Sequence, residues 1–334
     1  MEYLLYFTIL VAVFFDFTNG FHDTANAIAT SVSTRALSPG AAVVLSAVFN
    51  LVGALVTVFV FGGKVSNTIG KLLAFKVGLS VIIAALVGAI AWNLLTWYLG
   101  LPSSSTHALI GGLLGAAVAA THSLGMIRWA QVTQVITYLV ISPVAGFLAA
   151  AIFMTILFNL VARRRPGPLN RVFRFMQALT ACFVSYSHGS NDAQKSMAAM
   201  TLALIATGHA TKFAPPAWVI VLAAVAIGFG TYAGGWRIIR TLGWRIYKLD
   251  PATGFGAQLM GASVIQVATQ LGFPVSTTHV ITGSVMGAGA PRQLTAIKWG
   301  VGANIVAAWL VTIPASAVVA WVAYAILHTA GVNG

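Results

Sequence analysis

Charged residues are scarce in this sequence. Only 7% of its 334 residues are charged and only five are acidic, whereas about a quarter of a soluble globular domain is charged. The single cysteine, Cys182, excludes a disulfide within the chain. Hydrophobic residues, by contrast, make up 59% of the sequence, and the runs 41–61, 77–100 and 217–233 approach or reach the length of about 20 residues that spans a bilayer. The composition predicts an all-α polytopic membrane protein.

The positive charge of the chain points to a membrane rather than to nucleic acid. The formal net charge is +13, but the basic residues cluster between hydrophobic runs, as they do in the cytoplasmic loops of membrane proteins. We therefore expect the lipid bilayer as a partner, and no nucleic acid. The first run, Tyr3 to Phe15, follows no basic segment and is expected to be a retained helix rather than a signal peptide.

Two polar motifs each occur twice, about 170 residues apart. Residues 19–26 (NGFHDTAN) are echoed by residues 188–195 (HGSNDAQK), and residues 101–107 (LPSSSTH) by residues 273–279 (FPVSTTH). Because the motifs keep their order and spacing, the chain is expected to contain two homologous halves.

We expect a first repeat over residues 1–162, a basic cytoplasmic linker over 163–175 and a second repeat over 176–334. Each repeat holds five hydrophobic blocks, so about ten segments are expected to cross the membrane. In order, the blocks are 3–30, 41–62, 77–100, 103–121, 130–161, 177–207, 217–235, 255–271, 275–290 and 296–327. Five crossings is an odd number, so the second repeat would be inverted relative to the first.

The distribution of basic residues favours one orientation. With the linker in the cytoplasm, cytoplasmic loops hold twelve of the 18 Lys and Arg residues and the other side holds five, which places both termini outside. One basic loop, 236–248, is amphipathic and is expected to lie on the membrane surface. Two alternatives to single crossings remain. Pro102 and Pro274 could begin re-entrant hairpins, and the long final block of each repeat could be a broken helix.

The two Ser/Thr clusters suit an anion. A proline followed by hydroxyl residues begins a helix inside the membrane, where the hydroxyls cap the helix and its free N–H groups carry partial positive charge. Two such helix starts offer a tetrahedral oxyanion many donors. The alternative is that these hydroxyls bond only to their own or a neighbouring helix. His107 and His279, which follow the clusters, either fix the turns or carry protons.

Acidic residues at membrane depth are costly, by about 2.5–3.5 kcal/mol each on insertion scales. Asp23 and Asp192 fall in hydrophobic runs and could bind a cation, accept a proton or bond to a protonated substrate oxygen. Lys195 stands where the first half has Asn26, and it can neutralise Asp192 or attract an anion. Asp16 lies about two helical turns before Asp23. Whether the two side chains share one face of the helix is left open.

Glycines accompany the polar motifs. Gly20 and Gly189 would permit a local break in the helix next to each aspartate. The Gly-x-x-x-Gly pairs at 111–115 and 283–287 have the spacing that lets helices pack closely, and we assign them no chemistry.

With these residues in hand, the sequence resembles the PiT family of inorganic phosphate transporters. The resemblance is carried by residues 20–26, 188–192 and the two proline-containing clusters, and it covers nearly the whole chain. It implies phosphate transport by two inverted repeats, with phosphate held between the Ser/Thr clusters and the aspartates. The implied substrate-binding residues are Ser104, Ser105, Thr106, Ser276, Thr277, Thr278, Asp23, Asp192, Asn26 and Lys195. The implied ion-coupling residues are Asp23, Asp192, His22 and Asn191.

His22 and Lys195 depart from the sodium-coupled branch of the family, which typically has Asn at both positions. The chain looks like the bacterial low-affinity branch, which is associated with proton-driven symport, often of a neutral metal–phosphate complex. The physics agrees in direction, because a fixed ammonium repels Na⁺. We expect a symporter of the bacterial inner (plasma) membrane that works by alternating access, with no cofactor, and with H⁺ or Na⁺ as the coupling ion. Two questions are left open: whether Mg²⁺ or another divalent ion accompanies phosphate, and whether the protein forms a homo-oligomer.

Other functions fit parts of the pattern. A permease for sulfate or another tetrahedral oxyanion would use the same scaffold, but a carboxylate acceptor favours phosphate, which offers an O–H. A sodium-coupled phosphate symporter and a channel are further alternatives. An enzyme is not expected, because Ser105 and His107 are duplicated and only two residues apart, which suits binding better than catalysis.

Overall fold

The chain folds into a bundle of helices. The computed structural model describes residues 2–73, 77–234, 248–292 and 294–332, and these ranges contain no β-strand. The helices are α1 (Glu2–Ser33), α2 (Pro39–Val56), α3 (Lys64–Gly70), α4 (Leu79–Leu99), α5 (Ser105–Thr121), α6 (Trp129–Val161), α7 (Pro166–Ala206), α8 (Ala217–Ala233), α10 (Pro251–Leu271), α11 (Thr277–Gly289) and α12 (Trp299–Thr329). The predicted surface segment 236–248 lies outside the described residues except for its last residue.

All ten predicted hydrophobic blocks are helices, and the short α3 is an addition that was not predicted. Within the part of the chain that the structure describes, five helical stretches are long and apolar enough to cross a membrane, as expected of a membrane protein. They are Glu2–Ser33, Pro39–Phe61, Leu79–Leu99, Trp129–Val161 and Ile305–Thr329. Helices α5 and α8 are shorter apolar helices of 17 residues each.

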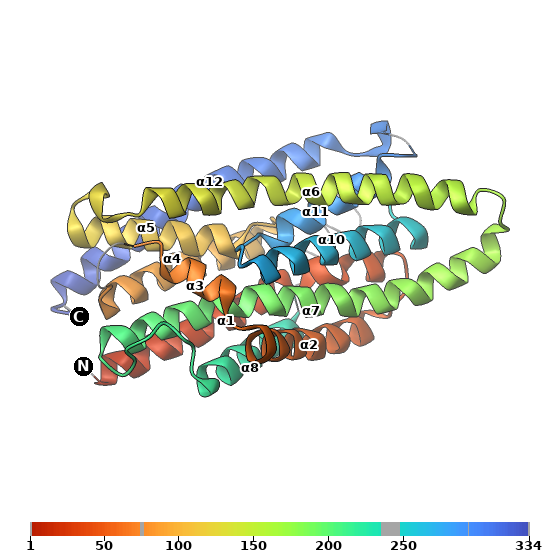
Figure 1. The fold of residues 1–334 in the computed structure, drawn as a ribbon. Coiled ribbons are helices and arrows are strands. Elements are labelled where there is room, and N and C mark those ends of the chain that lie inside the picture. Colours follow the sequence, from red (N-terminus) through yellow and green to blue (C-terminus); the bar gives the residue numbers. More distant parts are fainter. Residues whose placement is uncertain (1, 74–76, 235–247, 293, 333–334) are drawn as a thin grey trace.

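Both ends of the chain lie at the same end of the bundle, and the turn between α6 and α7 lies at the opposite end (Figure 1). Helix α7 has 41 residues and begins at Pro166, a residue type that suits the first turn of a helix. It therefore takes in most of the basic segment that was predicted to be a linker.

Two helical hairpins lie inside the bundle, α4 with α5 and α10 with α11. In each hairpin the first helix ends at a glycine with a positive φ, 67° at Gly100 and 79° at Gly272. The second helix then begins after a serine N-cap, Ser104 or Ser276. Helix α11 has 13 residues, so it is roughly 20 Å long and shorter than the hydrocarbon core of about 30 Å.

Glycines join the two halves of the chain closely. A Cβ at Gly20 would collide with the backbone of Ile227 on α8, and a Cβ at Gly189 would collide with the backbone of Asn50 on α2. The predicted helix break at these glycines is wrong, because α1 and α7 run through them without interruption. The missing side chains serve close packing between helices instead.

The Gly-x-x-x-Gly pairs also pack as predicted. The pair at 111–115 on α5 lies against the backbone of α12, and the pair at 283–287 on α11 lies against the backbone of α6. The last helix of each half thus covers a hairpin of the other half.

The polar stretch of α1 lies between two hydrophobic cores. Phe15 and the residues before it pack in one core with the α4–α5 hairpin, and Ala25 and the residues after it pack in the other core with α10 and α11. This position places Asp23 beside the tips of both hairpins.

Candidate functional site

Asp23 connects the middle of α1 to both hairpin tips. Its Oδ1 lies 2.7 Å from His22 Nδ1 and accepts a hydrogen bond of 3.2 Å from the Thr278 hydroxyl of α11. Its Oδ2 accepts a hydrogen bond of 3.1 Å from the Ser105 hydroxyl of α5. Because Asp23 is buried, these partners supply the polar contacts that water would supply at a surface.

The Lys195 ammonium lies on the other side of Ser105. It donates to Ser105 Oγ at 2.7 Å, to Thr106 Oγ1 at 3.2 Å and to Asp192 Oδ2 at 2.7 Å. An ammonium has three donors, so all of them are used, although the side chain is only 1% exposed. Lys195, Asp192, Ser105 and Asp23 therefore form one continuous network.

No role was predicted for His188, yet its ring lies between the two carboxylates. Its Nε2 is 3.3 Å from Asp192 Oδ2 and 3.8 Å from Asp23 Oδ2, and its Nδ1 is 2.8 Å from Asn50 Oδ1. Because Asn50 donates its amide to Thr231, its oxygen is the acceptor and His188 Nδ1 carries the hydrogen. A proton on Nε2 as well would give both carboxylates a positive partner. The i,i+4 spacing from Asp192 is the sequence signal that would have found this residue.

The same three side chains are the candidate metal ligands. Asp23, His188 and Asp192 each offer one ligand atom, and these atoms lie within 4.8 Å of one another. Carboxylate and imidazole suit several divalent ions. However, the Lys195 ammonium is bonded to the same Asp192 oxygen that approaches His188, so a dication would meet a fixed positive charge there.

The two hairpin tips touch each other. Thr106 donates its hydroxyl to the carbonyl of Val275 at 3.0 Å, and the rings of His107 and His279 lie 4.5 Å apart. The ring of His279 also stacks on Trp309 of α12 at 3.6 Å. These contacts hold the tips together at the centre of the bundle.

The predicted serines at the tips act as helix caps. Ser104 accepts a hydrogen bond from the backbone N–H of His107, and Ser276 accepts one from that of His279, each at 3.2 Å. This matching geometry leaves the hydroxyls of the following residues to face the network. Thr277 is buried in the first turn of α11.

Two predicted asparagines have different partners. Asn26 donates to Thr278 at 2.8 Å and so joins the Asp23 network. Asn191 points elsewhere, since its amide donates to Thr269 at 2.8 Å and to the Phe273 carbonyl at 3.3 Å, so it supports the α10–α11 turn.

His22 reaches the α4–α5 turn through its second ring nitrogen. Its Nε2 lies 3.3 Å from the hydroxyl of Thr96 and 3.4 Å from that of Ser103. Neither hydroxyl residue was given a role individually from the sequence, because the contact depends on how α4 packs against α1.

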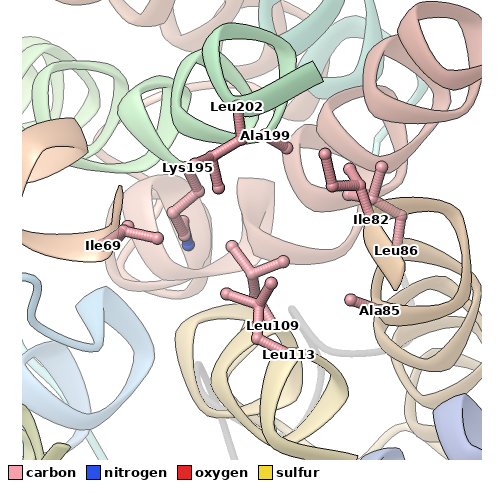
Figure 2. Close-up of a pocket in the computed structure, with 9 residues that line it drawn as sticks. All are labelled: Ile69, Ile82, Ala85, Leu86, Leu109, Leu113, Lys195, Ala199 and Leu202. Carbon is pink, nitrogen blue, oxygen red and sulfur yellow. The ribbon is translucent and has the colours of Figure 1, made fainter. Parts of the chain in front are cut away.

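A small cavity of about 10 Å³ borders the stem of Lys195, which is room for about one water molecule. Figure 2 shows the lysine side chain among apolar side chains of α3, α4, α5 and α7. The other lining residues are Ile69, Ile82, Ala85, Leu86, Leu109, Leu113, Ala199 and Leu202. The charged end of Lys195 is therefore directed to the network by an apolar sleeve around its stem.

Known proteins share this architecture and sequence. The pattern of the phosphate transporter family matches residues 19–320. A protein of Bacillus subtilis (strain 168), named "Probable low-affinity inorganic phosphate transporter", is 44% identical over 98% of this chain and 99% of its own length. A protein of the same name from Rhizobium meliloti (strain 1021) is 45% identical over 96% of each chain.

One solved structure has a similar fold. It is named "The sodium-dependent phosphate transporter", and it aligns with a TM-score of 0.87 over 98% of this chain and 100% of its own, at 25% sequence identity.

Proposed function

Because the chain belongs to the phosphate transporter family, we propose that it is a secondary active transporter that imports inorganic phosphate across the bacterial plasma membrane. The observation that carries this proposal is the convergence of both hairpin tips on Asp23 and Lys195. The family and the relatives are transporters by name, and the chain is not an enzyme.

Phosphate binds where the hydroxyls, the ammonium and the carboxylates now bond to one another. Lys195 and the Ser105, Thr106 and Thr278 hydroxyls supply donors, and they come from three different helices. Hydrogen bonds from a charged donor are worth about 1.5–3 kcal/mol each, so Lys195 makes the strongest single contact. The Ser104 and Ser276 caps hold two helix N-termini toward the same place, where their N–H groups favour an anion.

The carboxylate favours phosphate over sulfate. At neutral pH a phosphate monoanion or dianion carries an O–H, and Asp23 can accept it, whereas sulfate offers only acceptors. A carboxylate facing sulfate would leave two acceptors opposed without a hydrogen between them. Asp192 adds a second acceptor on the other side of Lys195.

Alternating access follows from two inverted repeats, residues 1–162 and 176–334, with the basic segment 163–175 in the cytoplasm and both termini outside. Support comes from the matched packing of the halves. Each hairpin tip carries the same serine cap and the same glycine pair against a helix of the other half. Rocking of one half against the other would open the buried site to each side in turn.

We propose the proton as the coupling ion. The Lys195 ammonium lies within the network, and a fixed positive charge there disfavours Na⁺ at the same place. The second candidate is sodium coupling, which is favoured by the fold that this chain shares with a solved sodium-dependent phosphate transporter. A divalent ion bound with phosphate would lie near Asp23 and His188, the ligand atoms farther from Lys195.

The test is uptake of radiolabelled phosphate into proteoliposomes, with imposed pH or Na⁺ gradients and with or without Mg²⁺. Uptake driven by an inward proton gradient, competed weakly by sulfate, is the expected result. Asp23→Asn and Asp192→Asn are each expected to abolish uptake while folded protein remains in the membrane. Glu2→Gln, at the exposed start of α1, is the control. Normal uptake by both aspartate variants would show that the carboxylates are not part of the transport site.

A further inference from the structure

A third buried carboxylate lies outside the network. Asp16 on α1 is fully buried. Its Oδ2 accepts a hydrogen bond of 2.7 Å from the Ser196 hydroxyl of α7, and its Oδ1 has no hydrogen-bond partner. Among the described residues no Lys, Arg or His forms an ion pair with it. An ionised carboxylate in such surroundings is costly unless a cation or proton compensates it.

Two buried amides on neighbouring helices also lack hydrogen-bond partners. Asn19, one turn after Asp16 on α1, has neither its amide oxygen nor its amide nitrogen hydrogen-bonded. Asn93 on α4 is unpartnered in the same way. Helices α1 and α4 run in the same direction, because the start of each lies in one hydrophobic core. Thr96 faces His22, so Asn93 and Asn19, each three residues earlier, lie at the same level.

We propose that Asp16, with Asn19 and Ser196, is a second ion site that binds the proton accompanying phosphate. The inference rests on the proposed function as a proton-coupled phosphate transporter. A protonated carboxyl gains an O–H that can donate to an amide oxygen, and Asn19 Oδ1 is a buried acceptor in need of one. Protonation therefore supplies the hydrogen bond that the ionised form lacks. The proton would lie on Oδ1, so Oδ2 can accept the hydrogen bond from Ser196 in both protonation states.

The site is close enough to the phosphate network to communicate with it. Ser196, which donates to Asp16, directly follows Lys195 on α7, and Asp192 lies about one turn before it. On α1 itself, His22 and Asp23 lie about 9–10 Å farther along the helix axis. The remaining titratable groups on the packed helices α4 and α8 are Tyr98 and Tyr232, which are 62% and 63% exposed and point away from the interior.

This arrangement couples the two ligands without a shared contact. A proton on Asp16 removes one negative charge from the interior and so strengthens the binding of an anion at Lys195. By reciprocity, a bound phosphate strengthens the binding of the proton. Proton and phosphate then favour one another's binding before the site changes sides, which is what symport requires.

The experiment compares Asp16→Asn with the parent protein in proteoliposomes, at clamped membrane potential. Asparagine keeps an oxygen for Ser196 and cannot change charge. The variant is expected to exchange external for internal phosphate, while phosphate accumulation driven by a pH gradient falls at least about fivefold, the lower end of typical coupling between sites. Exchange also shows that the variant is folded. Glu2→Gln on the same helix is expected to keep accumulation.

Each outcome has one reading. Accumulation by Asp16→Asn equal to that of the parent would overturn the inference and leave the proposed function standing. A parent that carries no phosphate under any gradient would overturn the proposed function itself. If Asp16→Asn loses accumulation driven by a Na⁺ gradient but keeps accumulation driven by a pH gradient, the assignment of the proton to this site is overturned. If Asp16→Asn gives no exchange, Ser196→Ala decides, because it is expected to shift the pH at which uptake is half-maximal. An unchanged pH profile would overturn the inference.

Discussion

The ion pair between Lys195 and Asp192 gives the sharpest test of the energetics of this site. We consider Lys195→Met, Asp192→Asn and the double variant. Methionine fills the apolar sleeve around the lysine stem without the charge, and asparagine keeps the shape of the aspartate. Each single change leaves one buried group without its partner at 2.7 Å.

The expected change in the free energy of unfolding follows from the burial of both side chains of the pair. At 2.7 Å and an effective dielectric constant of about 20, the attraction is about 6 kcal/mol. Desolvation of the two ions offsets much of this, at several kcal/mol per ion. The net contribution of the intact pair is therefore small, but removing one partner is expected to lower the free energy of unfolding by about 3–5 kcal/mol. Removing both should cost less than the sum by about 1–3 kcal/mol.

The assay is denaturant unfolding in detergent micelles, analysed as a double-mutant cycle. The matched control is the cycle for Arg292 and Asp250, whose side chains are 46% and 34% exposed, and which should show a coupling below about 1 kcal/mol. The reasoning would be refuted if the double variant lost as much free energy of unfolding as the two single variants together. Such additivity would mean that neither buried charge at Lys195 and Asp192 is stabilised by the other.

Two further predictions concern packing and the hairpin tips. Gly189→Val should prevent recovery of folded protein from membranes, because a Cβ there would collide with the backbone of Asn50, whereas Gly167→Ala, which has open space around it, should be recovered normally. Thr278→Val removes the hydroxyl that links Asn26 to the carboxylate of α1 and should lower the apparent phosphate affinity by about tenfold, for a loss of about 1–1.5 kcal/mol. Measured uptake affinity equal to that of the parent would contradict the second prediction, and normal yield of the valine variant would contradict the first.

Much of the architecture is predictable because membrane helices are read from hydrophobic runs. Apart from the start of α7, the runs fix where the helices begin and end to within a few residues. The repeated proline–hydroxyl clusters correctly mark the starts of α5 and α11. The basic segment after residue 162 was harder to predict, since Pro166 favours the first turn of a helix as readily as a break. Polar composition alone therefore placed the start of α7 too late.

The glycines show why contacts between helices are less predictable. Gly20 and Gly189 permit either a break in their own helix or the close approach of another, and only the neighbouring helix decides between them. The neighbours of Gly189 on α2 are set by tertiary packing, as is the hydrogen bond from Asn50 to His188. For the same reason the sequence names most residues of the candidate site but not His188, which lies between the two carboxylates.

The two halves match in geometry at this site but differ in charge. In one half the Asn26 amide donates to Thr278 at 2.8 Å, and at the corresponding position of the other half the Lys195 ammonium donates to Thr106 at 3.2 Å. Each threonine hydroxyl accepts a hydrogen bond from the equivalent residue of α1 or α7, which fits the proposal that both tips face one oxyanion. Among the residues that the structure describes, only the α5 tip is bonded to a positive charge, that of Lys195 on α7, and an anion should therefore lie nearer to α7 than to the symmetric midpoint. Asp16 belongs to α1 in the other half, but it accepts a hydrogen bond from Ser196 of α7, so the proposed proton site and the proposed anion site both border α7.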